Sequence, residues 1–424
     1  MAQPQLELGR FFGYHAQMRQ VKVSPPHHPS VVLVCAPMSP TTKAPVRGSA
    51  TPGAPRPSVL VVSKPVAPPW NDSSKNLVKD IACAARRFDF QLLAPRGCSW
   101  SPPEHVHLEP IYRDVGSFSP AATQNLRALL RLLQADDSAI RHFYFAPNPK
   151  TSLVARWIGR IHRKPTIQTV CSIPRSVNPR LLFADRVVVL SAATRHHFIT
   201  AGVAPERLVH IPPGISLPSL VGPERRALLR RHFGIPATGR VALFAGDYLF
   251  SSAARVFARA LTKVRDRGAF FVFACRVKGL ESRRIEAEID AELRAAGVRS
   301  RALMLDEVPA MLDLVAACDV CALPAESLYA KMDLPLVLLE AMGHRLPLVV
   351  ADIPPLTELL DPRGEVGRAT PAGDAEALAA ALDAELARGR RDAPRALAAE
   401  RYAIGKIAPR VEALYDELLS ARRS

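Results

Sequence analysis

One segment of the C-terminal half, residues 318–360, holds side chains that could do chemistry. Lys331 and Asp333 place an ammonium and a carboxylate in a polar loop, and Glu340 places a second carboxylate in an otherwise apolar run, LVLLEAM. Charged groups of this kind bind polar ligands through charge-assisted hydrogen bonds. On these residues alone, a satisfied core or capping carboxylate explains Glu340 equally well.

An alternating α/β pattern positions these groups. The apolar run Val320–Leu323 predicts a strand, Pro335 suits the first turn of a helix, and Gly343 ends that helix before a second apolar strand, LPLVVAD. In doubly wound α/β folds, ligands bind beyond the carboxyl ends of strands and at the helix N-termini that follow. Lys331 and Asp333 occupy such a position.

Other predicted strands also end in polar or small residues. In the C-terminal half, VALFAGD ends in Gly246 and Asp247, and FFVFACRVK ends in Arg276 and Lys278. In the N-terminal half, the residues that follow apolar strands are Asn71, Asp72, Asn148, Cys171 and Arg175. Asn and Asp at such positions are also ordinary turn and N-cap residues.

The composition favours anionic partners. The 424 residues carry a formal charge of +17, which suits nucleic acid, an anionic membrane surface or phosphorylated small molecules. Because no helix-turn-helix, zinc-finger or aromatic-basic pattern is present, we expect no nucleic-acid partner. No run of about 18 apolar residues and no secretory signal is apparent, so we expect a cytoplasmic protein.

The cysteines indicate a reduced chain. There are seven, an odd number scattered along the sequence, which argues against a disulfide framework. Cys318 and Cys321 form a C-x-x-C that could be a redox pair or half of a zinc site. Because they lie in and beside an apolar strand with no second Cys/His pair nearby, we expect two core residues.

Two series of alternating strands and helices are separated by a Pro-Pro-Gly linker at about Ile211–Pro218. We predict a disordered Pro-rich extension over residues 1–57, in which only VVLVCA could form a strand. Two Rossmann-like domains follow at 58–213 and 214–400, and a helix at 401–424 packs back on the N-terminal domain. Two such domains imply a cleft, the default ligand site.

Four stretches together resemble the retaining glycosyltransferases called "glycosyl transferases group 1". They read ADRVVVLSAATRHHFITAGVAPERLVHIPPGI, VALFAGDYLFSSAARVFARAL, AACDVCALPAES and LPLVLLEAMGHRLPLVVADIPPLTELL. The resemblance covers residues 58–419 and implies the α/β fold called GT-B, in which two Rossmann-like doubly wound domains face each other across a cleft. It implies an acceptor domain at the N-terminal side and a nucleotide-sugar donor domain at the C-terminal side.

The resemblance also implies residue roles, and the sequence departs from some of them. Glu340 matches a family glutamate that accepts hydrogen bonds from the donor ribose. Met332 stands eight positions earlier, where the family has a glutamate that holds sugar hydroxyls. Asp247 lies in a region where family members commonly have Arg and Lys, and Cys171 replaces a frequent histidine.

The candidate site residues therefore form three sets. Catalytic candidates are Asp333, Lys331 and Glu340, with Glu326 as a possible substitute for the missing acid. Donor-binding candidates are Gly246, Asp247, Arg276, Lys278, Leu334, Pro335, Leu336 and Glu340. Acceptor-side candidates are Asn71, Asp72, Asn148, Cys171 and Arg175. No metal ligands are predicted.

The implied reaction moves a sugar from a nucleotide diphosphate sugar to a glycan or lipid-linked acceptor, with retention and without a cofactor or a metal. Two alternatives stay open: a catalytically impaired GT-B scaffold or nucleotide-sugar-binding partner subunit, and a nucleotide-sugar epimerase. The basic amphipathic helix Ser152–His162 predicts peripheral contact with an anionic membrane at its inner, cytoplasmic face.

Overall fold

The computed structural model describes residues 56–113, 122–134, 136–172, 174, 177–249, 251–329 and 331–422. The VVLVCA run and Arg175 lie outside the described residues. The disorder expected for residues 1–57 falls almost entirely outside them as well.

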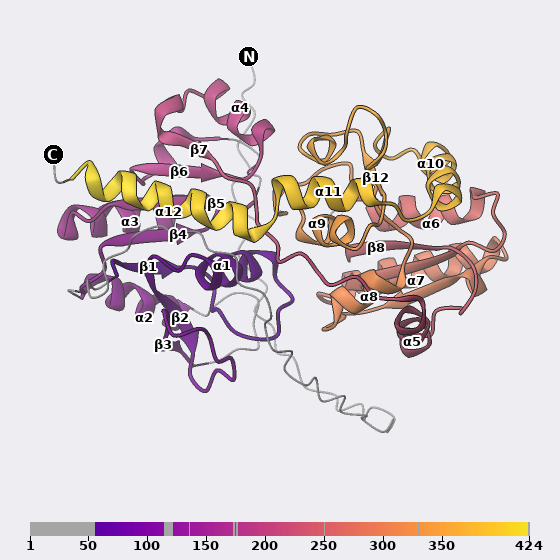
Figure 1. Ribbon diagram of the computed structural model, residues 1–424, viewed down its shortest axis with the longest axis horizontal. Coiled ribbons are helices and arrows are strands. Elements are labelled where there is room, and N and C mark those ends of the chain that lie inside the picture. Colours follow the sequence, from indigo (N-terminus) through magenta and orange to yellow (C-terminus); the bar gives the residue numbers. More distant parts are fainter. Residues whose placement is uncertain are drawn as a thin grey trace, which may run out of the picture. The chain divides into compact units, whose positions relative to one another are not determined.

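The first half of the described chain forms a sheet of seven parallel strands in the order β3-β2-β1-β4-β5-β6-β7 (Figure 1). The strands are β1 (Ser58–Val62), β2 (Asp89–Pro95), β3 (Val106–Tyr112), β4 (Ile140–Tyr144), β5 (Thr166–Val170), β6 (Arg186–Val189) and β7 (Leu208–His210). The order reverses direction between β1 and β4, so the loops after these two strands lie side by side, where doubly wound sheets bind ligands.

Helices cover both faces of this sheet, because its buried strands are apolar on both sides. In β1, Val59 and Val61 pack into one core cluster and Leu60 into another, as the two-residue period of a strand requires. The Leu60 cluster contains residues of α2 and α3. The helices of this half are α1 (Ser73–Ala84), α2 (Ala122–Leu133), α3 (Pro149–His162) and α4 (Ala192–Thr200).

The second half forms a sheet of six parallel strands in the order β10-β9-β8-β11-β12-β13. The strands are β8 (Val241–Asp247), β9 (Phe270–Arg276), β10 (Ala302–Leu305), β11 (Val320–Leu323), β12 (Leu348–Ala351) and β13 (Gly367–Thr370). The helices are α5 (Pro223–Phe233), α6 (Ala253–Lys263), α7 (Leu280–Ala295), α8 (Met311–Ala317), α9 (Leu336–Gly343), α10 (Ala375–Arg388), α11 (Asp392–Arg401) and α12 (Ile404–Ser420). Because these strands are parallel, the loops after β8, β9 and β11 all begin at the carboxyl edge of the sheet.

The chain passes between the two sheets twice, and the two passages are hydrogen-bonded to each other. The amide of Ile215 donates to the carbonyl of Tyr402 at 2.8 Å, and the amide of Ile404 donates to the carbonyl of Ile215 at 2.8 Å. At Gly214 a Cβ atom would lie 2.7 Å from Cδ1 of Ile404, so a side chain there would require Ile404 to shift.

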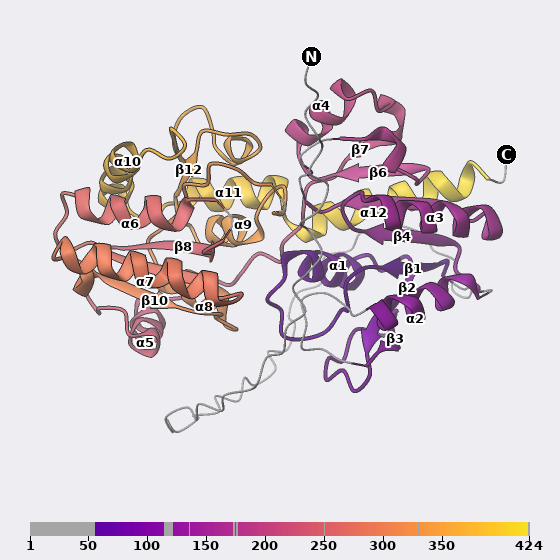
Figure 2. The same cartoon turned by 180° about the vertical axis from the view of Figure 1, so that it is seen from behind.

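The last helix, α12, packs against α1 of the first sheet (Figures 1 and 2). The hydroxyl of Tyr415 lies 2.8 Å from Nδ1 of the buried His142 on β4. The Nε of Arg87 donates to the Glu412 carboxylate at 3.1 Å. These contacts connect the C-terminal end of the described chain to its N-terminal half. The domain boundaries proposed from the sequence remain predictions.

A buried carboxylate supports the start of β4. Asp136 accepts a hydrogen bond from Nη2 of Arg141 at 2.8 Å and one from Nζ of Lys164 at 2.7 Å. The side chain of Arg141 is only 1% exposed. Burial raises the pKa of Asp136, but the hydrogen bonds from Lys164, Ser138 and Arg141 outweigh it and hold the pKa well below its usual range.

We expect Asp136→Ala to lower the free energy of unfolding by about 3–5 kcal/mol, because it leaves the buried Arg141 guanidinium without a counterion. Urea denaturation at neutral pH measures this change. Arg283→Ala is the control, because it breaks a half-exposed pair with Asp306 on the surface and is expected to cost under about 1 kcal/mol. Equal losses in the two variants would contradict the expectation.

Candidate functional site

A large cavity lies at the carboxyl edges of both sheets. Its volume is about 1310 Å³, and its lining comes from the loops after β1, β4, β5 and β9, from α2 and α3, and from the loop before α9. The residues of the second sheet that line it are Arg276, Val277, Lys278, Lys331 and Met332. Residues from both halves of the described chain therefore build this site.

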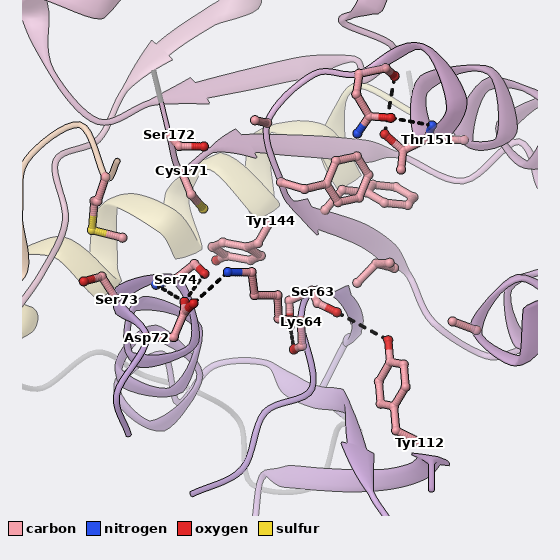
Figure 3. Close-up of a pocket in the computed structure, with 18 of the residues that line it drawn as sticks. Ser63, Lys64, Asp72, Ser73, Ser74, Tyr112, Tyr144, Thr151, Cys171 and Ser172 are labelled. Atoms are coloured by element: carbon pink, nitrogen blue, oxygen red, sulfur yellow. Dashed lines mark hydrogen bonds and ion pairs between the residues drawn. The ribbon is translucent and has the colours of Figure 1, made fainter. Parts of the chain in front are cut away.

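The loop after β1 contributes an ion pair to the cavity. Nζ of Lys64 donates to the Asp72 carboxylate at 2.6 Å (Figure 3). Asp72 also caps α1 by accepting from the amides of Ser74 at 2.9 Å and Lys75 at 3.3 Å. Burial opposes ionisation, but Lys64 and the hydrogen bonds lower the pKa of Asp72 to about 2. Asp72 is thus both the helix cap and a cavity residue.

The strand ends of β4 and β5 supply the next part of the wall. Asn148 caps α3 by accepting from the Thr151 amide at 3.0 Å, and both residues line the cavity. In Figure 3 the Cys171 thiol lies near the ring of Tyr144. Burial raises the pKa of the Cys171 thiol to about 12, so it stays protonated at neutral pH and is a poor nucleophile.

The strand ends of the second sheet bring cations together around one carboxylate. Asp247 is fully buried at the side chain and accepts from Nζ of Lys278 at 2.8 Å and also from Nζ of Lys331. Burial raises the pKa of Asp247, but the two lysines outweigh it and lower the pKa. Arg276 donates from Nη1 to the carbonyl of Asn71 at 2.9 Å. Three cationic side chains therefore gather at the ends of β8 and β9 and in the loop before α9.

We call Arg276, Lys278 and Lys331 the cationic cluster. All three line the cavity, and the two lysine side chains are about a quarter exposed. Asp247 does not line the cavity, but its carboxylate holds the Lys278 and Lys331 side chains by hydrogen bonds. An acid at this position therefore fixes two cations in place.

Glu340 lies in α9 and is mostly buried. Burial, reinforced by Asp80 and opposed by Lys79, raises the pKa of its carboxyl from 4.5 to about 7. Among the described residues, no side chain or amide donates a hydrogen bond to this carboxylate. It is not one of the residues that line the 1310 Å³ cavity. A partly buried carboxylate without a protein donor among the described residues is suited to accept hydrogen bonds from a ligand.

Asp333 points to a different place than its neighbour Lys331. Its carboxylate accepts from the hydroxyls of Ser191 and Thr194 at the start of α4, both at 2.8 Å, and its side chain is buried. Burial outweighs these hydrogen bonds and raises the pKa of Asp333 to about 6. Asp333 does not line the cavity. The geometry gives it the role of joining the loop before α9 to α4.

Glu358 binds the same helix end. Its carboxylate accepts from the amides of Ala192 and Ala193 at 3.0 and 2.7 Å. The N-terminus of α4 therefore holds two carboxylates from the second half of the chain. This is the favourable end of a helix for negative charge.

Met332 lies in the cavity wall where the resemblance expects an acid. Its backbone pairs with Ser172 in an isolated antiparallel bridge, which holds the loop before α9 against the end of β5. The thioether cannot donate a hydrogen bond and is only a weak acceptor.

The remaining donor-side candidates have small or apolar side chains. At Gly246 a Cβ atom would lie 2.9 Å from Cζ of Phe244, so a side chain does not fit there without a shift. Pro335 is the N-cap residue of α9, and Leu334 and Leu336 are buried on either side of it. Asn71, an acceptor-side candidate, uses its side-chain amide to donate to Glu307. None of these five residues lines the cavity.

A second hollow of about 850 Å³ lies beside α4 and the loops after β8, β11 and β12. Glu326 and Tyr329, from the polar loop after β11, line it. Glu326 is therefore separated from the cationic cluster.

Several cavity residues were not predicted from the sequence. Ser63, Lys64, Tyr144, Thr151 and Ser172 all line the cavity. Each lies at or just beyond the end of an apolar strand or in the first turn of the following helix. The rule that ligands bind beyond strand ends would have found them, whereas a search for charged motifs did not.

Among the described residues, no group of three or more His, Cys, Asp and Glu side chains is arranged to hold a metal ion. Within the same residues, no helix has the length and hydropathy needed to cross a membrane. Their six cysteines are all unpaired, and Cys318 and Cys321 are buried, as expected.

Comparison with solved structures gives the fold. HepE from Anabaena, crystallised with UDP and glucose, matches with a TM-score of 0.67 and 18% identity over 85% of this chain and 100% of its own. Sucrose-phosphate synthase from Thermosynechococcus elongatus matches with a TM-score of 0.68 and 16% identity over 86% and 100%. WaaG, a glycosyltransferase involved in lipopolysaccharide biosynthesis, matches with a TM-score of 0.56 and 16% identity over 85% and 99%. The predicted GT-B fold is confirmed.

Comparison with sequences gives a family match over part of the chain. No curated protein matches this chain significantly. The model of the family "Glycosyl transferases group 1" matches residues 239–388, which contain the cationic cluster, Asp247 and Glu340. The resemblance seen in the sequence is thereby confirmed, and the chain carries a glycosyl transferases group 1 domain on a GT-B fold.

Proposed function

We propose that this protein transfers a sugar from a nucleotide diphosphate sugar to a glycan or lipid-linked acceptor. The observation that carries the proposal is the cationic cluster, in which Arg276, Lys278 and Lys331 of the family-matched residues line the cavity. A diphosphate gains most from cations that are held in place before it binds. HepE, of the same fold, was crystallised with UDP-glucose, which agrees with this donor class.

The proposed donor lies with its diphosphate at the cationic cluster and its ribose hydroxyls on Glu340. Ionised Glu340 offers two acceptor oxygens to two neighbouring hydroxyls. The sugar then faces the part of the cavity lined by Lys64, Asp72 and Tyr144. Asp333, which bonds Ser191 and Thr194, holds the loop of Lys331 in place.

We also propose that transfer proceeds with retention and without a bound metal. Negative charge develops on the departing diphosphate, and the cationic cluster supplies the positive charge that a metal would otherwise provide. The anomeric configuration of the product, followed by proton NMR at early times, tests retention. An inverted first product would contradict it.

The rate of donor consumption should be unchanged by excess EDTA. The reason is that Arg276, Lys278 and Lys331 are fixed cations of the protein and are not removed by a chelator. Release of nucleoside diphosphate, measured with matched buffers containing EDTA or Mg²⁺, checks this. A large loss of rate in EDTA that Mg²⁺ restores would contradict metal independence.

A second candidate function is a binding subunit without catalysis. Met332 and Cys171 favour it, because a thioether and a protonated thiol line the cavity where the family has an acid and a histidine. It predicts saturable donor binding with no release of nucleoside diphosphate in the presence of any acceptor. An epimerase would instead release a second nucleotide sugar, which NMR of the product distinguishes.

We further propose peripheral contact with an anionic membrane at its cytoplasmic face. On α3, Leu153, Trp157 and Ile161 are spaced four residues apart on one face and are at least half exposed. The described part of α3 contains no acid, and Arg156 lies between them. An exposed apolar stripe with basic neighbours is typical of interfacial helices.

Vesicles that contain anionic lipid should therefore bind the protein and shift the Trp157 emission to shorter wavelength, whereas zwitterionic vesicles should not. Binding should weaken as salt is raised, because part of the attraction is electrostatic. Sedimentation with vesicles measures it, and Leu153→Ser with Ile161→Ser should reduce it. Equal sedimentation of this double variant would contradict the assignment to α3.

A further inference from the structure

The cavity has an apolar part that the donor does not use. α2 contributes Leu129 and Leu132, α3 contributes Ala155 and Ile158, and β4 contributes Phe143. Protein cores are normally packed without voids larger than a water molecule. An apolar space of this kind that is continuous with a polar site is therefore typical of a ligand pocket.

Small residues help to keep this space open. Ala128 on α2 and Ala155 on α3 both line the cavity, and Ala155 is only 4% exposed. Larger apolar residues at these positions would occupy the space between the helices and the sheet. The same cavity reaches Arg276, Lys278 and Lys331, so one continuous space joins apolar walls to fixed cations.

The apolar part also opens to the surface. Leu126 on α2 and Val154 on α3 line the cavity and are 54% and 36% exposed. Beside them Leu130 on α2 and Leu153 on α3 are exposed as well. Exposed apolar residues that continue the lining of a pocket mark the place where an apolar ligand enters or leaves.

We propose that the acceptor carries an apolar chain, which lies between α2 and α3 while the polar head that receives the sugar faces the cationic cluster. This inference rests on the proposed function and deepens it by naming the acceptor class. A simple glycan would leave the exposed or partly exposed apolar lining at Leu126, Leu129 and Val154 in contact with water. An apolar chain removes this surface from water and leaves the molecule at Leu126 and Val154.

The direct test uses the full chain and alkyl phosphates with butyl, octyl and dodecyl groups, below their micelle concentrations, in calorimetric titrations. Because each buried methylene strengthens binding about three- to fourfold, octyl phosphate should bind at least about tenfold more tightly than butyl phosphate. Dodecyl glucoside in place of dodecyl phosphate shows whether the head must be anionic. Binding that is independent of chain length would overturn the proposal.

Matched variants separate the pocket from the outer surface. Ala155→Phe fills the space between the helices and should abolish the dependence on chain length. Leu126→Ser should weaken dodecyl phosphate binding severalfold. Because Leu126 is about half exposed, this substitution is expected to leave the fold intact. Leu228→Ser removes a half-exposed leucine of α5 that does not line the cavity and should leave binding unchanged. Equal effects of the Leu126 and Leu228 variants would mean surface adsorption and would overturn the proposal.

Donor titrations keep this inference distinct from the proposed function. Ala155→Phe should bind nucleotide sugar as the natural protein does, because Ala155 lies on α3 in the first half of the described chain, whereas the proposed diphosphate contacts Arg276, Lys278 and Lys331 belong to the second half. If the alkyl phosphates bind with the expected dependence on chain length but no nucleotide sugar binds, the apolar pocket is supported and the proposed glycosyl transfer is contradicted. If nucleotide sugar binds but binding of the alkyl phosphates does not depend on chain length, glycosyl transfer is supported and the apolar pocket is contradicted.

Discussion

Replacing Lys331 with methionine is expected to lower kcat/KM for sugar transfer by about a hundred- to a thousandfold. Loss of one preorganised donor to a developing oxyanion has an effect of this size. Methionine keeps the length and apolar stem of the side chain, and Asp247 keeps its other partner, Lys278, at 2.8 Å. The fold is therefore expected to survive. Steady-state release of nucleoside diphosphate measures the effect.

The control for Lys331→Met is Lys263→Met on α6. Lys263 pairs with Glu376 on the surface at 2.7 Å and does not line the cavity. This variant should keep full activity. If Lys331→Met also keeps full activity while its circular dichroism and unfolding midpoint match those of the natural protein, the diphosphate contact assigned to Lys331 is wrong.

Replacing Glu340 with glutamine is expected to weaken binding of the nucleotide sugar by about ten- to a hundredfold at pH 8. Hydrogen bonds to a charged group contribute about 1.5–3 kcal/mol, and glutamine offers one neutral acceptor oxygen in its place. The affinity of the natural protein should rise from pH 6 to pH 8 as Glu340 ionises around its pKa of about 7. The glutamine variant should lack this rise. Calorimetric titration at several pH values measures both.

The same substitution should make the protein more stable above neutral pH. The pKa of Glu340 is raised on folding from 4.5 to about 7, so the folded state binds more protons than the unfolded state between these values. Stability from this group therefore falls as pH rises from about 4.5 to 7 and stays low above that. Glu340→Gln removes the buried charge. It should raise the free energy of unfolding by on the order of 1–3 kcal/mol at pH 8 and leave it unchanged below about pH 4.5.

A variant that is more stable and binds worse is the signature of a group retained for function. A structural Glu340 would give the opposite result, a loss of stability with unchanged binding. Urea denaturation at pH 4.5 and pH 8 separates the two roles. Asp333→Asn is the comparison, since Asp333 is also buried but bonds Ser191 and Thr194 within the protein.

The central strands could be predicted from the sequence, and the edge strands could not. β1, β8, β9 and β12 are continuous apolar runs because both of their faces are covered. β3 lies at the edge of its sheet and reads VHLEPIY, in which a histidine, a glutamate and a proline interrupt the pattern. β13 is also an edge strand and has only four residues, GRAT.

The site was predictable to the extent that it follows strand ends. Arg276 and Lys278 end one predicted strand and Asp247 ends its neighbour, so their approach to each other follows from parallel pairing of β8 with β9. The direction of Asp333 could not be predicted, because it depends on Ser191 and Thr194, which are more than a hundred positions away in the chain. Adjacent residues in one loop, Lys331 and Asp333, thus have different partners.

The most direct test of the central claim is a calorimetric titration of the natural protein with a panel of uridine, guanosine and adenosine diphosphate sugars. We predict saturable heat with at least one of them, weakened at least about tenfold in Lys331→Met and Glu340→Gln, since each removes a charged contact. No heat with any of these donors at high protein concentration would contradict the account of the cationic cluster and Glu340 as a nucleotide-sugar site.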